Sequence, residues 1–183
     1  MTYTVHNLET APEAARDILA GAKKTFGFVP NLLGVMAEAP PLVKAYTTLS
    51  RIFEETSFSP VERQVVLLTV SSENDCAYCV AAHSVIAGMH KVPSDVVGAI
   101  RDGKPIADAK LQALHRFTAA MTRQRGWPTE EDTRAFVQAG YTKTHVLEVV
   151  LGVGMKILSN YTNHAAATPL DAAFASAAWS KVA

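Results

Sequence analysis

"SPVERQVVLLTVSSENDCAYCVAAH", residues 59–83, contains the signals that decide the fold. Ser59 and Glu62 have the spacing of a capping box, in which each side chain bonds the other residue's backbone N–H, and Pro60 occupies the first helical position. The apolar run 61–73 is also rich enough in β-branched residues to suit a buried strand. Because a capping box begins helices, we expect 61–73 to be a helix buried on nearly every side.

The remainder of the chain carries signals of the same kind. Thr10 and Glu13 have capping-box spacing before a helix that should end at Gly27, and short connections separate the later helical patterns. No alternating strands joined by a tight turn are visible, and no long linker divides the sequence. The prediction is an all-α helical bundle, one domain over 1–183, with helices at 14–27, 30–39, 40–56, 61–73, 76–88, 94–103, 108–126, 129–140, 144–167 and 169–181.

Composition limits the classes of function. The chain has 183 residues and a formal net charge of zero, so it lacks the basic surface expected of a protein that binds nucleic acid. We expect no signal peptide and no membrane span, and hence a cytoplasmic location. There a CxxC pair is catalytic or metal-binding more often than it is a structural disulfide. Zero net charge and 49% hydrophobic residues also favour a homo-oligomer.

"CAYCVAAH", residues 76–83, holds both cysteines of the chain. On a helix, Cys76, Cys79 and His83 lie on one face, because they are three and four residues apart. With Asp75 as the N-cap, both sulfurs would sit in the first turn, where the helix dipole favours a thiolate, and His83 would hydrogen-bond the Cys79 sulfur. Simple core packing and a metal site are the other interpretations. The metal interpretation is weaker, because three ligands fall short of the usual four and His90 is too far along the helix.

A faint internal repeat is also visible. Residues from 65 onward align with those from 146 onward at an offset of 81, which places His83 over His164 and Cys79 over Asn160, so 142–165 is a possible degenerate copy of the 59–90 motif. Separately, His164 forms a polar face with Asn160 and Asn163 on an otherwise apolar helix. This face either lines the pocket opposite the cysteines or satisfies the carbonyls at the end of the helix.

Residues 59–93 resemble the core motif of the alkylhydroperoxidase D-like (AhpD-like) family, within the carboxymuconolactone decarboxylase superfamily. "FGFVPNLLGVMAEAPPLVKAY", residues 26–46, resembles the peroxidase-related branch of that family. The resemblance implies an all-helical fold, assembly into trimers or hexamers, and reduction of a small hydroperoxide or a partner disulfide. It also implies that Cys79 becomes a sulfenic acid, that Cys76 resolves it, and that His83 is the relay base.

One position departs from the pattern. The founding enzyme of the family has a glutamate twelve residues before the first cysteine, where this chain has Gln64. Glu73 and Glu62 are the candidate replacements in the proton relay, although Glu62 is also explained by the capping box. We therefore predict a thiol-dependent peroxidase or disulfide reductase that uses no metal or bound cofactor and takes electrons from a dithiol or a protein disulfide reductant. The alternatives are a non-catalytic redox sensor and a lyase that uses His83 with a carboxylate.

Overall fold

The computed structural model describes residues 2–181, and the regular elements within that range are all helices. The all-α prediction is therefore confirmed, while 169–181, predicted as a helix, contains only a short 3-10 turn. The elements are α1 (Glu13–Phe26), α2 (Asn31–Met36), α3 (Pro40–Phe53), α4 (Pro60–Glu73), α5 (Ala77–Met89), α6 (Ser94–Arg101), α7 (Ala109–Arg123), α8 (Glu130–Gln138), α9 (Lys143–Ala166) and the 3-10 helix η1 (Ala172–Ala177).

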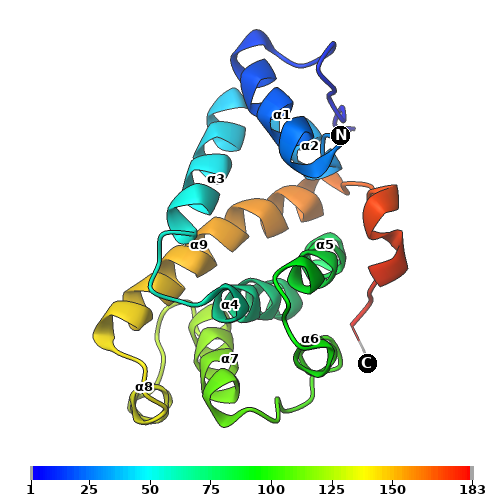
Figure 1. Cartoon of the computed structure of the whole chain (residues 1–183). Coiled ribbons are helices and arrows are strands. Elements are labelled where there is room, and N and C mark those ends of the chain that lie inside the picture. The colour runs from blue at the N-terminus through cyan, green and yellow to red at the C-terminus, as the bar shows by residue number, and fades with distance from the viewer. Residues whose placement is uncertain (1, 182–183) are drawn as a thin grey trace.

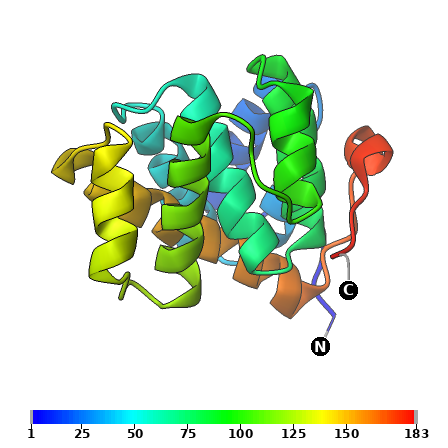
Figure 2. The same ribbon diagram turned by 90° about the horizontal axis from the view of Figure 1, so that it is seen from below.

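Helix α4 lies at the centre of the molecule and packs against α5, α6, α7 and α9. Its capping box is confirmed, since the Ser59 side chain accepts from the Glu62 N–H and the Glu62 carboxylate accepts from the Ser59 N–H. Nine of its residues are buried, as expected for a central helix. Figure 1 shows α9, coloured yellow to orange, crossing the molecule between α2–α3 and α4–α7, with which it makes contact. Figure 2 shows α7 and α8 side by side at the far end from η1.

The start of α1 differs from the prediction. Its N-cap is Pro12, which has no side-chain cap, and the Thr10 hydroxyl instead accepts from the Asn7 N–H at 3.0 Å within the preceding turn. The Thr10 hydroxyl is therefore occupied within this turn and does not cap α1. The predicted end at Gly27 is confirmed, and this glycine adopts the left-handed conformation (φ 82°) that commonly terminates helices.

Two apolar clusters form the core. The larger one surrounds α4 and joins α6, α7, α8 and α9. The second joins α1, α2 and α3 to the outer side of α5, and it contains both cysteines together with Phe174 of η1. The cysteines therefore lie where α1–α3 and the C-terminal segment close over the helix that carries them. Within residues 2–181, no helix is both long enough and apolar enough to cross a membrane.

Candidate active site

Helix α5 begins one residue later than predicted, at Ala77, and Cys76 is its N-cap. Asp75, predicted to be the N-cap, belongs to the end of α4 instead. It adopts a left-handed conformation (φ 54°), its N–H bonds the Ser72 carbonyl, and the Cys76 N–H bonds the Ser71 carbonyl at 2.9 Å. These two bonds are those of a Schellman motif with Asp75 at the position usually taken by glycine. One tight turn thus ends α4 and sets the direction of the cysteine helix.

The two sulfurs share a hydrogen-bond donor on α9. The Asn163 side-chain amide lies 3.2 Å from the Cys79 sulfur and 3.6 Å from the Cys76 sulfur. Both cysteines are free and buried, with 1% and 2% of their surfaces exposed. Asn163 belongs to a polar stripe of α9 that includes Lys156 and Asn160, at helical spacing, and all three are buried. A single long helix therefore supplies the polar environment of both sulfurs.

The two thiols have opposite acidities. For Cys79 burial opposes ionisation, but the hydrogen bond from Cys76, the charge of Lys156 and the side chains of Ser159 and Asn160 hold its pKa well below the ordinary thiol value. The hydrogen bond to Cys79, together with burial, raises the pKa of Cys76. These opposite shifts favour Cys79 as the more acidic thiol of the pair.

His83 does not contact the sulfur as predicted; it lies between two other polar groups. Its Nε2 lies 3.1 Å from the Lys156 ammonium nitrogen, and its Nδ1 lies 3.1 Å from Oε1 of Gln64. An ammonium group only donates, so Nε2 accepts from charged Lys156 and Nδ1 carries the proton that is donated to Gln64. Burial and then the Lys156 charge hold the pKa of His83 well below its usual range, so the ring is neutral.

Lys156 is the site residue that the sequence analysis missed. It is wholly buried on α9, contacts His83, and acts on the ionisation of Cys79. A signal was present, because this lysine interrupts an apolar helix four residues before Asn160 and seven before Asn163. That spacing places the three polar groups on one face. Gln64, noted only as a departure from the family pattern, is the direct partner of His83.

Two of the predicted candidates, His164 and Glu73, lie apart from the sulfurs, whereas Asn160 is one of the groups that lower the pKa of Cys79. His164 is exposed, because it is one residue and about 100° around the helix from Asn163, which takes the inner position. Asn160 is buried, and its carbonyl oxygen accepts from Asn74 at 2.9 Å, which links α9 to the turn before α5. Glu73 forms an ion pair with Arg123 at 2.8 Å, and burial raises its pKa. No contact between Glu73 and His83 occurs within residues 2–181.

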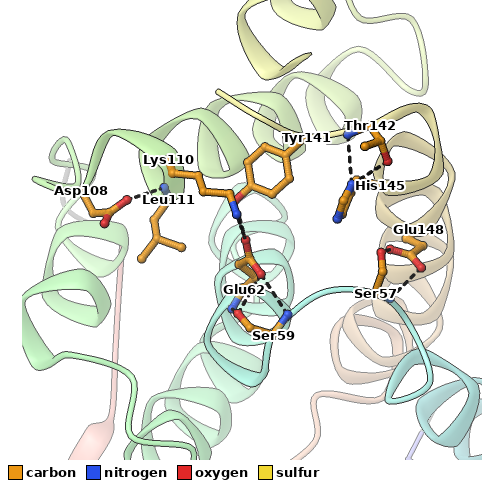
Figure 3. A network of polar contacts seen from close by, with 10 residues as sticks. All are labelled: Ser57, Ser59, Glu62, Asp108, Lys110, Leu111, Tyr141, Thr142, His145 and Glu148. Atoms are coloured by element: carbon orange, nitrogen blue, oxygen red, sulfur yellow. Dashed lines mark hydrogen bonds and ion pairs between the residues drawn. The ribbon is translucent and has the colours of Figure 1, made fainter. Parts of the chain in front are cut away.

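Glu62 also belongs to a different network, shown in Figure 3. Its carboxylate accepts from Ser59, from the Tyr141 hydroxyl at 3.0 Å and from Lys110 at 3.1 Å. Burial alone would raise its pKa, but these bonds lower it to about 2. Glu62 therefore caps α4 and joins it to Lys110 of α7 and to Tyr141, in the loop before α9.

Metal binding has little support from the geometry. Across residues 2–181, no three histidine, cysteine or acidic side chains are grouped closely enough to hold a metal ion. His83 Nε2 lies 3.1 Å from the ammonium nitrogen of Lys156, which repels a cation.

The chain resembles several solved structures along nearly its whole length. The AhpD-core peroxidase-related protein of Ralstonia eutropha JMP134 superposes with a TM-score of 0.83 at 21% identity, covering 94% of this chain and 93% of that one. A peroxidase-related protein of Silicibacter sp. TM1040 gives 0.79 at 22% identity, covering 95% of each chain. A cysteine-to-alanine variant of the debrominase Bmp8, in complex with 2,3,4-tribromopyrrole, gives 0.80 at 19% identity, covering 97% and 95%.

No protein-family model and no curated protein matches the sequence. The structural likeness, at these identities, establishes the fold. It agrees with the all-helical architecture that the CxxCxxxH resemblance implied. This chain has the fold of the AhpD core found in peroxidase-related proteins.

Proposed function

We propose that the protein is a thiol-dependent oxidoreductase that reduces a small hydroperoxide through Cys79 and Cys76. The observation that carries the proposal is the geometry of the pair: two free, buried cysteines, Cys76 and Cys79, lie 3.6 Å and 3.2 Å from the Asn163 amide. Beside it, the Cys76 hydrogen bond and the Lys156 charge lower the pKa of Cys79, while the pKa of Cys76 is raised. A nucleophilic thiolate next to a protonated thiol is the arrangement that peroxide reduction requires.

The chemistry proceeds in two oxidative steps. The Cys79 thiolate attacks one peroxide oxygen, the O–O bond breaks, and an alcohol leaves after taking up a proton, so that Cys79 becomes a sulfenic acid. The Cys76 thiol then attacks the Cys79 sulfur and water leaves, which closes a disulfide. A dithiol or a protein disulfide reductant returns both residues to their starting state by thiol–disulfide exchange. Because both sulfurs are almost fully buried, small substrates are favoured unless the covering segments move.

Reductive debromination is the second candidate. The support is the likeness to the debrominase Bmp8, whose solved complex contains 2,3,4-tribromopyrrole. A thiolate with a neighbouring thiol supplies the same two electrons to a carbon–bromine bond as to a peroxide bond. The lyase alternative has less support, since the hydrogen-bond partners of His83 within residues 2–181 are Gln64 and Lys156 and include no carboxylate.

One experiment tests the redox proposal directly. Reduced protein receives one equivalent of hydroperoxide, and its free thiols and intact mass are measured before and after. The expected result is loss of two thiols and of two hydrogens. Unchanged thiols with hydroperoxide but loss on addition of a bromopyrrole would favour debromination. A disulfide that forms once, but is never turned over by dithiols, would favour a redox sensor.

Two serine variants test the division of roles. Cys79→Ser should abolish peroxide consumption, because it removes the thiolate. Cys76→Ser should consume one peroxide and stop at a sulfenic acid that dimedone traps. A sulfenic acid on Cys76 in the Cys79→Ser protein, and none on Cys79 in the other variant, would show that the roles are reversed.

We also propose that the chain forms a trimer or a dimer of trimers in the cytoplasm. Leu147, Val150 and Tyr161 lie along one side of α9 and are 69%, 48% and 57% exposed, which favours a covered face in an assembly. Light scattering tests this, and a mass near 19.6 kDa at micromolar concentration would rule out the assembly.

A further inference from the structure

Lys156 is a buried cation without a carboxylate partner. None of its surface is exposed, and no aspartate or glutamate of residues 2–181 forms an ion pair with it. Its ammonium nitrogen lies 3.1 Å from Nε2 of the neutral His83 ring, and it also hydrogen-bonds the side chain of Cys79. An uncompensated ammonium in a protein interior costs several kcal/mol, so such a lysine either has an anion nearby or gives up its proton.

The groups that surround Lys156 identify that anion. The titratable side chains that act on it are Tyr46 of α3, Cys76 at the N-cap of α5, and Cys79 and His83 within α5. Asn163 lies two turns further along α9, against both sulfurs. Histidine cannot supply a negative charge at ordinary pH, and a thiol ionises more readily than a phenol. Cys76 is itself the donor to Cys79. Of the groups around buried Lys156, Cys79, whose side chain it hydrogen-bonds, is the one best able to supply a negative charge.

This pairing ties the charge of Lys156 to the oxidation state of Cys79. In the reduced protein the thiolate and the ammonium neutralise each other. In the sulfenic acid and in the disulfide the sulfur carries no charge, so the ammonium would be left alone in the interior. Gln64 cannot replace the missing anion, because its side chain is an amide and its oxygen already accepts from His83.

We propose that Lys156 is the proton donor of peroxide cleavage and that it holds its proton only while Cys79 is a thiolate. The inference rests on the proposed function. It adds a proton donor, which the amide side chain of Gln64 cannot provide. The Cys79 thiolate, the hydroperoxide and the Lys156 ammonium give the Cys79 sulfenic acid, an alcohol and neutral Lys156 amine. The S–O bond forms, the O–O bond breaks, and the Lys156 proton goes to the departing oxygen.

The reductive half-reaction restores the starting state. After Cys76 closes the disulfide and water leaves, a dithiol is oxidised to its own disulfide and gives up two protons. One of these protons goes to the Cys76 thiol and the other to the Lys156 amine, while Cys79 returns as a thiolate. The protein therefore takes up two protons on reduction although only one of its cysteines is protonated.

That combination is the signature to measure. The oxidised protein is reduced by excess dithiothreitol at pH 7 in weakly buffered solution, and proton release is recorded per disulfide reduced. The thiolate of the product is measured by its ultraviolet absorbance, with Cys79→Ser as the blank. We expect one thiolate and no net proton release, since the two protons from the reductant are both retained. One thiolate with one released proton would show that Lys156 stays charged in both oxidation states. No thiolate at all would show that the ion pair between Lys156 and Cys79 does not exist. Either result overturns the inference.

Variants at Lys156 separate its two roles. Lys156→Arg keeps the positive charge but cannot release a proton, so it should retain the thiolate, release one proton per disulfide, and slow peroxide cleavage about 10²–10⁴-fold. Lys156→Met should lose the thiolate at pH 7. Lys44→Met, at an exposed position on α3, is the matched control and should behave as the unsubstituted protein does. If Lys156→Arg cleaves peroxide at the full rate, Lys156 is not the proton donor, whatever the substitution does to the stability of the protein.

The proton count does not depend on the substrate. It uses only a disulfide and dithiothreitol, so it can succeed when hydroperoxide is not consumed, in which case the proposed peroxidase activity fails and the coupling of Lys156 to Cys79 stands. Conversely, a protein that consumes peroxide can still release one proton per disulfide, in which case the peroxidase activity stands and the coupling of Lys156 to Cys79 fails.

Discussion

The hydroxyl of Tyr78, the second residue between the two cysteines, donates a hydrogen bond to the carboxylate of Asp171, 93 residues further along the chain. The same hydroxyl accepts from the Leu32 N–H at 3.2 Å, and Asp171 also accepts from the Asn31 N–H at 3.0 Å. Phe174 packs edge-on against the Tyr78 ring. These contacts tie the C-terminal segment and the start of α2 to the helix that carries the cysteines.

Tyr78→Phe should loosen this connection. The substitution removes one hydroxyl that makes two buried hydrogen bonds, so the free energy of unfolding should fall by about 1–3 kcal/mol. The two cysteines should also react faster with a small thiol reagent, because the segments that cover them open more often. Urea denaturation and the modification rate measure the two effects. Tyr3→Phe, at an exposed position before α1, is the control and should change neither.

Two glycines of α9 should respond in opposite directions to the same substitution. A Cβ at Gly152 would lie 2.8 Å from a Val66 methyl and 2.9 Å from the Phe53 ring, so Gly152→Ala should cost about 1–3 kcal/mol of stability. A Cβ at Gly154 meets nothing within 4 Å, so Gly154→Ala should stabilise the helix by about 0.5–1 kcal/mol. Thermal unfolding of both variants checks the pair, and equal effects would contradict the close packing of α9 on α3 and α4.

Glu62 should govern stability in acid without affecting the cysteines. Its pKa of about 2 in the folded protein lies below the ordinary value of 4.5, so its contribution is complete above about pH 4.5 and is lost as the pH falls toward 2. That contribution is on the order of 3 kcal/mol. Glu62→Gln should remove this part of the acid dependence and leave the thiolate absorbance unchanged. Glu148→Gln, which also loses a carboxylate bonded to a serine but at a more exposed position, should cost less.

Gln64→Glu should change the ionisation of His83. A carboxylate in place of the amide would lie about as far from Nδ1 as the present oxygen, at 3.1 Å, and would favour the imidazolium. We expect the pKa of His83 to rise toward or above its ordinary value, as measured by NMR titration of the ring. Gln64→Met, of similar size but uncharged, is the control and should leave His83 neutral. An unchanged His83 titration in Gln64→Glu would mean that the ring does not face this side chain.

Local signals account for most of what the sequence predicted correctly. The capping box at Ser59, the left-handed glycine at 27 and the helical period of the apolar residues each depend on contacts within four residues, which a sequence displays directly. The placement of Cys79 and His83 on one side of α5 is of the same kind, because residues four apart on a helix share a face. Thr10 and Asp75 show the limit of such signals, since each serves a neighbouring turn in place of the predicted cap.

The tertiary structure decided which residues complete the site. Gln64 and Lys156 lie 19 and 73 residues from His83 in the chain, and Asn163 lies 84 residues from Cys79. These groups meet only because α4 and α9 pack beside α5. Asn163 and His164 point in directions about 100° apart on α9, so the rotation of this helix about its axis decided which of them faced the sulfurs. The apolar pattern of that helix does not fix such a rotation, because both sides of α9 carry apolar side chains. The sequence thus determined the helices and the pair of thiols, whereas the acidity of each thiol was decided by packing, since burial and the position of one ammonium group set the electrostatic energy of a charge on sulfur.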